Sequence, residues 1–333
     1  MNRRAFIGGL LLGAAIRCAH AQQPAKVYRV AVVSPSTPVG EISETGDFRY
    51  RAFLVRLREL GYVEGQNLTV ARYSAEERTE NFAELARTVL RDGPEVISAS
   101  GDRLAREFRA ATDTIPIVTT VSDPVTLGLV KTLARPGGNI TGTSIDGGVE
   151  MEGKRLELLC EMVPRASKVG YLATRRVWEE GTYVRATKEA AARMKISLVG
   201  PPLDAPFREV EYRRVLTMMA REGADALVVN AQPENTTNAR LIVELAKQTR
   251  LPAIYSYPSF AEIGGLMTYG VDLSDVMRHS ADQVDLILKG ATPGDIPFYQ
   301  PTKFHLVINL KTAKALGIEI PNSLLAQADE VIE

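Results

Sequence analysis

Val96-Ile-Ser-Ala-Ser100 is a short β-branched run, and Ile115-Pro-Ile-Val-Thr-Thr-Val121 is a second such run. Between them, residues 102–111 carry apolar side chains at helical spacing. Short apolar runs bounded by turn residues predict buried strands, and the order strand, helix, strand predicts parallel neighbours joined by a crossover helix. This stretch therefore indicates an α/β fold with a parallel sheet.

The same alternation continues on both sides of this stretch. Upstream, strands are expected at 27–33 and 67–73, and helices at 45–61 and 77–91. Downstream, residues 134–142 are rich in turn formers and are expected to form a loop, after which the alternation restarts. The second series comprises helices at 150–163, 182–194, 207–222 and 238–249 and strands at 168–172, 196–199, 226–230, 252–255 and 266–269. The chain is therefore predicted to be an α/β protein with two doubly wound parallel-sheet lobes.

The N-terminus has the layout of a cleavable secretory signal peptide over residues 1–21. Arg3 and Arg4 form a basic region, residues 7–16 are apolar, and Ala19-His20-Ala21 places small residues at the first and third positions of a cleavage site. The apolar run is too short to span a bilayer, which needs roughly 20 residues. We expect export to the periplasm by the general secretory route or, because Arg3-Arg4-x-Phe6 resembles a twin-arginine motif, by the twin-arginine route.

The charge balance argues against nucleic acid as a partner. The whole chain has 40 basic and 40 acidic residues, and removing Arg3, Arg4 and Arg17 with the signal leaves 37 basic against 40 acidic residues. Without a basic excess, no nucleic-acid partner is expected. Beyond the signal, no apolar run is long enough to cross a membrane, so no stable membrane insertion of the mature chain is expected.

The sequence contains no pattern typical of catalysis. No predicted strand is followed by G-x-G-x-x-G, and neither a Walker sequence nor a G-x-S-x-G elbow is present. The histidines beyond the signal, His279 and His305, belong to no recognised zinc-ligand pattern. We therefore expect a protein that is not an enzyme and that uses no metal or other cofactor.

Several segments together resemble one protein family. They are LRELGYVEGQNL at 57–68, SDPV at 122–125, GLVKTLARPGGNITG at 128–142, KRLELL at 154–159, GLMTYGVD at 265–272 and QPTKFHLVINLKTAKALG at 300–317. In combination they resemble the ABC-transporter substrate-binding protein family that includes tryptophan-binding proteins. The resemblance covers nearly the whole mature chain.

The resemblance implies a type I periplasmic-binding-protein-like fold, in which a hinge joins the two lobes and the ligand lies in the cleft between them. It also implies that the tail crosses between lobes, so that helix 274–289 packs on the first lobe and strand 305–309 joins the second. The expected domains are residues 1–21 as signal peptide, 27–143 plus 272–297 as N-terminal lobe, and 144–271 plus 298–333 as C-terminal lobe.

The expected ligand site lies beyond the carboxyl ends of the strands, where open parallel sheets bind ligands. Those ends carry hydroxyl, amide and charged side chains, which suit a small polar or anionic ligand. The expected ligand-binding residues are Ser34, Ser36, Ser100, Gly101, Asp102, Ser122 and Asp123 in the first half and Thr174, Arg175, Asn230, Gln232, Tyr255, Tyr257 and Asp272 in the second.

Several of these residues have a second interpretation. Asp123 precedes Pro124, so it either pairs with a ligand ammonium or caps the following turn. The serines either donate to a ligand carboxylate or satisfy the local backbone. Arg175 either clamps an acid or stays solvated. Of Tyr255 and Tyr257, one is expected to point into the cleft and the other into the packing.

The resulting hypothesis is an exported solute-binding protein of an ABC importer. It captures a small polar molecule, an amino acid or a related organic acid, and delivers it to an inner-membrane ABC permease with its ATPase. The alternative is an extracytoplasmic ligand-sensing receptor of the same fold that feeds a membrane kinase or chemoreceptor. Loops 100–103 and 173–178 depart from the family's usual pattern, so the resemblance leaves the ligand open.

Overall fold

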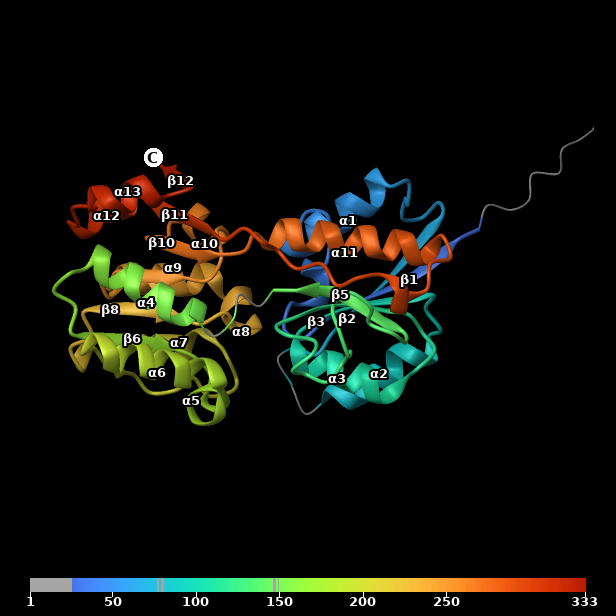
Figure 1. Cartoon of the computed structure of the whole chain (residues 1–333), viewed down its shortest axis with the longest axis horizontal. Coiled ribbons are helices and arrows are strands. Elements are labelled where there is room, and N and C mark those ends of the chain that lie inside the picture. The colour runs from blue at the N-terminus through green and yellow to red at the C-terminus, as the bar shows by residue number, and fades with distance from the viewer. Residues whose placement is uncertain (1–25, 77, 79–80, 146–147, 149) are drawn as a thin grey trace, which may run out of the picture.

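Two α/β lobes lie side by side in the computed structural model of the chain (Figure 1). The structure describes residues 26–76, 78, 81–145, 148 and 150–333. The segment expected to be a signal peptide, residues 1–21, lies outside these ranges. Within them, no helix combines the length and the apolar character that crossing a membrane requires.

The first lobe is built on a parallel sheet with the strand order β2-β1-β3-β4-β5. Its strands are β1 (Tyr28–Ser34), β2 (Leu68–Ser74), β3 (Val96–Ser100), β4 (Ile117–Val121) and β5 (Ile140–Ser144). The middle of β1, residues 30–33, is fully buried. Strands with this near-continuous apolar character are expected where helices cover both faces of a sheet.

Helices cover the first-lobe sheet on both faces. Helices α1 (Phe48–Glu59) and α11 (Leu273–Leu288) pack together on one face, and α2 (Phe82–Arg91) and α3 (Asp102–Ala111) pack on the other. Figure 1 shows orange α11 beside blue α1, although the two are far apart in the sequence. The short 3₁₀ helices are η1 (Val39–Glu41) and η3 (Pro293–Asp295).

Strand β5 is a correction to the sequence analysis. Residues 134–142 were expected to form a loop, but residues 140–142 belong to β5 and pair with β4. At Gly142, a Cβ atom would lie 1.9 Å from the Thr119 carbonyl oxygen, so only glycine allows the two strands to approach this closely. The same glycine is a turn signal in the sequence, which explains the wrong prediction.

The second lobe is built on a mixed sheet with the order β12-β11-β10-β9-β8-β6-β7. Its strands are β6 (Lys168–Leu172), β7 (Ser197–Val199), β8 (Ala226–Val229), β9 (Ala253–Tyr255), β10 (Met267–Gly270), β11 (His305–Asn309) and β12 (Glu330–Ile332). Strand β11 is antiparallel to β10 because the chain re-enters this lobe from the first one. The edge strand β12 was not expected from the sequence.

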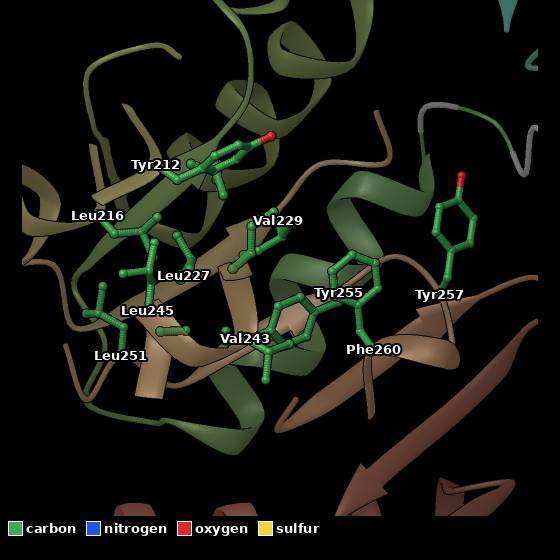
Figure 2. Close-up of a cluster of buried hydrophobic side chains, with 14 of the residues drawn as sticks. Tyr212, Leu216, Leu227, Val229, Val243, Leu245, Leu251, Tyr255, Tyr257 and Phe260 are labelled. Atoms are coloured by element: carbon green, nitrogen blue, oxygen red, sulfur yellow. The ribbon is translucent and has the colours of Figure 1, made fainter. Parts of the chain in front are cut away.

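The helices of the second lobe cover both faces of its sheet, and one of the resulting cores is drawn in Figure 2. They are α4 (Glu150–Met162), α5 (Arg175–Glu180), α6 (Thr182–Met194), α7 (Glu209–Arg221), α8 (Pro233–Thr237), α9 (Ala239–Gln248), α10 (Ser259–Glu262), α12 (Leu310–Leu316) and α13 (Asn322–Gln327).

The chain passes between the lobes after β5, between β10 and α11, and between η3 and β11. The third passage starts beside the first, because the Tyr299 backbone exchanges hydrogen bonds with Gly142 (2.9 Å) and Ser144 (2.8 Å) at β5. Phe298 also stays with the first lobe, donating from its backbone N–H to the Leu133 carbonyl oxygen (2.8 Å). Helix α11 thus completes the first lobe and β11 the second.

Candidate functional site

The junction of β1 and β3 is where the topology of the first-lobe sheet predicts a ligand site. Helix α1 leaves β1 toward one face of the sheet, and α3 leaves β3 toward the other. Such a junction opens a crevice at the carboxyl ends of the strands, where ligands of α/β sheets bind. Ser34 ends β1 and Ser100 ends β3, so both predicted residues lie at this crevice.

Ser34 and Ser36 shape the loop after β1. The Ser34 hydroxyl oxygen accepts hydrogen bonds from the backbone N–H groups of Ser36 (3.3 Å) and Thr37 (2.8 Å). The Ser36 hydroxyl lies 2.7 Å from the hydroxyl of Thr237, on α8 of the second lobe. Ser34 therefore organises its own loop, whereas Ser36 reaches across to the other lobe.

Gly101 and Asp102 begin α3 next to the end of β4. Gly101 has a φ of 96°, a conformation that glycine adopts without strain. Asp102 accepts from the Ser122 backbone N–H (2.8 Å) with Oδ1 and from the Ser122 hydroxyl (2.6 Å) with Oδ2. A carboxylate offers about four lone-pair sites, so Asp102 keeps acceptor capacity for a ligand cation.

Asp123 has the local role that the sequence analysis gave as its second interpretation. Its Oδ1 accepts from the backbone N–H groups of Val125 (2.9 Å) and Thr126 (3.1 Å), and its Oδ2 accepts from the Thr126 hydroxyl (2.6 Å). Although burial disfavours the charged form, these bonds hold the pKa of Asp123 below its ordinary value. In this structure, Asp123 caps its own turn.

The corresponding junction in the second lobe lies between β6 and β8. Thr174 follows β6, and Gln232 from the loop after β8 binds it twice: Oε1 accepts from the Thr174 backbone N–H (2.9 Å), and Nε2 donates to the Thr174 hydroxyl (2.9 Å). Asn230 donates from Nδ2 to the Tyr171 hydroxyl (2.7 Å). These predicted residues therefore lie together at one crevice, where their mutual hydrogen bonds fix the loops.

Arg175 and Asp272 form an ion pair and a helix cap, respectively. Arg175 is half exposed at the start of α5 and donates from Nε to the Asp204 carboxylate (2.7 Å). Asp272 caps α11 by accepting from the Ser274 backbone N–H (2.8 Å). It borders a polar cavity of about 290 Å³ beside Tyr299, at the segments that connect the lobes.

The two predicted tyrosines are both buried, but their side chains lie apart. The Tyr255 ring stacks on Phe260 in the second-lobe core, with 4.8 Å between ring centroids. Figure 2 shows the Tyr257 side chain pointing away from this pair. Burial raises the pKa of Tyr257 to about 12 against the opposing effects of Arg155 and Arg49, so its phenol stays neutral and can donate a hydrogen bond.

The ion pair Arg49–Asp47 of the first lobe, with side chains 12% and 13% exposed, was missed in the sequence. Its arginine acts electrostatically on Tyr257. Arg49 donates to both carboxylate oxygens of Asp47, from Nε (2.9 Å) and Nη2 (2.8 Å), and to the Thr37 hydroxyl (2.9 Å). Burial lowers the pKa of Arg49, but the Asp47 carboxylate more than offsets this and holds it above its ordinary value. No sequence signal separates Arg49 from the solvated arginines of the same helix.

A second ion pair, Arg155–Glu152, approaches Tyr257 from the second lobe. Arg155 donates from Nη1 to Glu152 (2.7 Å) and from Nε to the Tyr269 carbonyl oxygen (2.8 Å). Both side chains are less than a tenth exposed. The sequence does carry a signal for this pair, because residues 152, 155 and 159 share the apolar stripe of α4 with residue 156.

Charged groups of both signs act electrostatically on the Tyr257 phenol. Arg49 and Asp102 act on its phenol from the first lobe, and Arg155 and Glu152 act on it from the second. Each guanidinium has its own carboxylate partner, so neither arginine is an uncompensated positive charge. Separated positive and negative groups in a water-poor site suit a small ligand that carries both charges.

Among the described residues, no three His, Cys, Asp or Glu side chains are grouped so as to hold a metal ion. The half-buried Cys160 thiol stays protonated at neutral pH, because burial raises its pKa.

Comparison with known proteins agrees with this geometry. The family described as ABC transporter substrate binding protein matches residues 45–332, more than half of the chain. A tyrosine-binding protein of Clostridioides difficile strain R20291 is 26% identical over 270 residues, which is 81% of this chain and 76% of that protein.

Two solved structures share the fold. A conserved domain protein from Vibrio cholerae is 27% identical with a TM-score of 0.78, covering 92% of this chain and 100% of that one. A domain from Streptococcus pneumonia in complex with L-Trp is 24% identical with a TM-score of 0.76, at the same coverages. Proteins of this family bind substrates for a transporter and are not enzymes. The chain belongs to the ABC transporter substrate-binding protein family.

Proposed function

We propose that the protein captures a zwitterionic amino acid between its lobes and delivers it to an inner-membrane ABC permease with its ATPase. The observation that carries this proposal is a pair of enclosed ion pairs, Arg49–Asp47 (2.8 Å) in the first lobe and Arg155–Glu152 (2.7 Å) in the second. Both arginines also act electrostatically on Tyr257. An α-amino acid presents an ammonium and a carboxylate one carbon apart, which matches groups of both signs gathered in one place.

The relatives support the choice of ligand class. One is named as a tyrosine-binding protein, and the other structure holds L-Trp. Both ligands are α-amino acids with a large aromatic side chain. Among the residues predicted from the sequence, we propose that Ser100, Asp102 and Tyr257 touch the ligand, while Ser34, Ser36, Ser122, Thr174, Asn230 and Gln232 hold the loops that carry them.

Capture by closure follows from the two-lobed arrangement. A ligand that contacts both lobes binds the closed form better than the open form, and this difference in affinity selects the closed form. Ser36 and Thr237 already meet across the lobes at 2.7 Å. The closed form is then the species that the permease recognises.

The proposed location is the periplasm. It rests on the layout of residues 1–21, which have a basic region, an apolar run and a small-residue cleavage site. N-terminal sequencing of protein from the periplasmic fraction tests it: a chain that starts at Gln22 supports export, and a chain that starts at Met1 contradicts it.

A thermal-shift panel tests the ligand class. Purified protein is heated with each common amino acid, with organic acids lacking an ammonium, and with sugars. One or a few amino acids should raise the melting temperature, because a ligand that binds only the folded state stabilises it. Stabilisation by sugars or by simple organic acids, with none by any amino acid, would contradict the proposal.

A further inference from the structure

The Tyr50 hydroxyl is buried without a partner at the crevice of the first lobe. Tyr50 lies on α1 and is 1% exposed. Its hydroxyl lies near Ser34 and Ser100, the last residues of β1 and β3, yet it makes no well-formed hydrogen bond to any described residue. Buried polar groups in folded proteins are normally paired, so this one requires an explanation.

Ser34 cannot supply the missing acceptor. Its hydroxyl oxygen already accepts from the backbone N–H groups of Ser36 and Thr37, which occupy both of its lone pairs. The Ser34 and Tyr50 hydroxyls are therefore two O–H donors at the same place, and neither the Ser100 hydroxyl nor any other described group accepts from Tyr50 in good hydrogen-bond geometry. An anionic oxygen would satisfy such an arrangement.

The N-terminus of α3 adds further donors at this crevice. The helix has ten residues and begins after Gly101, where no side chain caps it. Its first backbone N–H groups have no partner within the helix and carry a partial positive charge. Next to them, the Asp102 carboxylate accepts from Ser122 and offers the opposite charge.

We propose that the Tyr50 hydroxyl donates a hydrogen bond to the α-carboxylate of the ligand, beside the N-terminus of α3, while Asp102 receives the α-ammonium. This inference rests on the proposed function, because it assigns the two ends of an amino acid to groups of the first lobe. Such donors discriminate strongly, since a ligand without the carboxylate leaves the buried hydroxyl unpaired.

The test compares L-tyrosine with tyramine, which lacks the carboxylate and so offers the Tyr50 hydroxyl no acceptor there. Titration calorimetry with Tyr50→Phe should show about 10- to 100-fold weaker binding of L-tyrosine, and a much smaller change for tyramine. The melting temperature of unliganded Tyr50→Phe should be equal to or above that of the wild type, because the variant removes an unpaired group.

Tyr62→Phe is the matched control. The Tyr62 hydroxyl is also in the first lobe but donates to Asp285 (2.9 Å). This variant should lower the melting temperature and leave both affinities unchanged. Equal losses for both ligands in Tyr50→Phe, or no loss for L-tyrosine, would overturn the inference while the proposed function stands. A wild-type protein that binds no L-α-amino acid would overturn both.

Discussion

The Ser36 hydroxyl lies 2.7 Å from the Thr237 hydroxyl, and this hydrogen bond joins the loop after β1 of the first lobe to α8 of the second. Ser36 also lies 3.5 Å from the carbonyl oxygen of Pro233, at the start of α8. Both hydroxyls are partly buried, so the bond stabilises this arrangement of the two lobes rather than the core of either one.

Thr237→Val should therefore shift the lobes toward an open arrangement. A hydrogen bond of this kind contributes about 0.5–1.5 kcal/mol, so ligand affinity should fall by about 2- to 12-fold. The radius of gyration of the unliganded protein, measured by X-ray scattering, should increase. Thr249→Val is the control, because the Thr249 hydroxyl bonds only within the end of α9. Equal scattering curves for Thr237→Val and wild type would contradict this role.

Asp102 and Asp123 provide a paired test of the ammonium site. Asp102→Asn should weaken binding of L-tyrosine about 10- to 100-fold, because it removes the negative charge that we propose receives the ligand ammonium. Asp123→Asn should lower stability by about 1 kcal/mol through its turn and change affinity by less than about twofold. If calorimetry showed a large loss of affinity for Asp123→Asn and none for Asp102→Asn, the ligand ammonium would be assigned to Asp123 instead.

The buried pair Arg155–Glu152 should behave differently from an exposed pair. Glu152→Leu leaves the buried guanidinium without its carboxylate and should cost about 3–5 kcal/mol in urea unfolding, whereas Glu152→Leu with Arg155→Met should recover part of this loss. Glu209→Gln breaks an exposed pair with Arg213 and should cost less than about 1 kcal/mol. Additive losses in the double variant would contradict the coupling.

Glu234 should make stability fall as pH rises. Burial raises its pKa, while its own backbone N–H, Arg176 and Arg103 act in the opposite direction. The folded protein then holds this proton to a higher pH than the unfolded chain does. Stability is therefore lost as pH rises from the unfolded carboxyl value of about 4.3 through the raised folded value.

Glu234→Gln removes the free-energy cost of ionising this carboxyl group in the folded protein. The variant should be more stable than the wild type at a pH of about 8, and the difference should shrink toward a pH of about 4, where both carry an uncharged group. Urea unfolding at both pH values measures this difference in the free energy of unfolding. A difference that is constant with pH would show that folding leaves the pKa of Glu234 unshifted, and one that grows toward acid would show that folding lowers it; either result would contradict a raised pKa.

The fold could be predicted from the sequence more completely than the site, because helices and strands leave local periodic patterns. Strands such as β6 (168–172) and helices such as α6 (182–194) carry local periodic patterns, so their ranges could be read directly. Strand β5 was missed because Gly142 serves a close contact with Thr119 that only the folded sheet contains. The edge strand β12 depends on β11 in the same way.

The proposed ligand site depends on contacts between the lobes, which sequence patterns do not record. The ends of the strands could be predicted, and Ser34, Ser100 and Asp102 do lie at one crevice. The roles of Arg49 and Tyr50 could not be predicted, because both resemble ordinary residues of an amphipathic helix until α1 is placed beside β1 and β3. The choice between the two roles of Asp123 likewise needed the geometry of its turn.

Titration calorimetry of the purified mature protein with L-tyrosine and L-tryptophan tests the central claim most directly, with tyramine and 3-(4-hydroxyphenyl)propionate as matched analogues that lack the carboxylate or the ammonium. The account predicts that at least one of the two amino acids binds at one molecule per chain, and that each analogue binds at least about tenfold more weakly than L-tyrosine if L-tyrosine is a ligand. Equal affinity for L-tyrosine and either analogue, or binding of neither amino acid, would contradict a site built for a zwitterion.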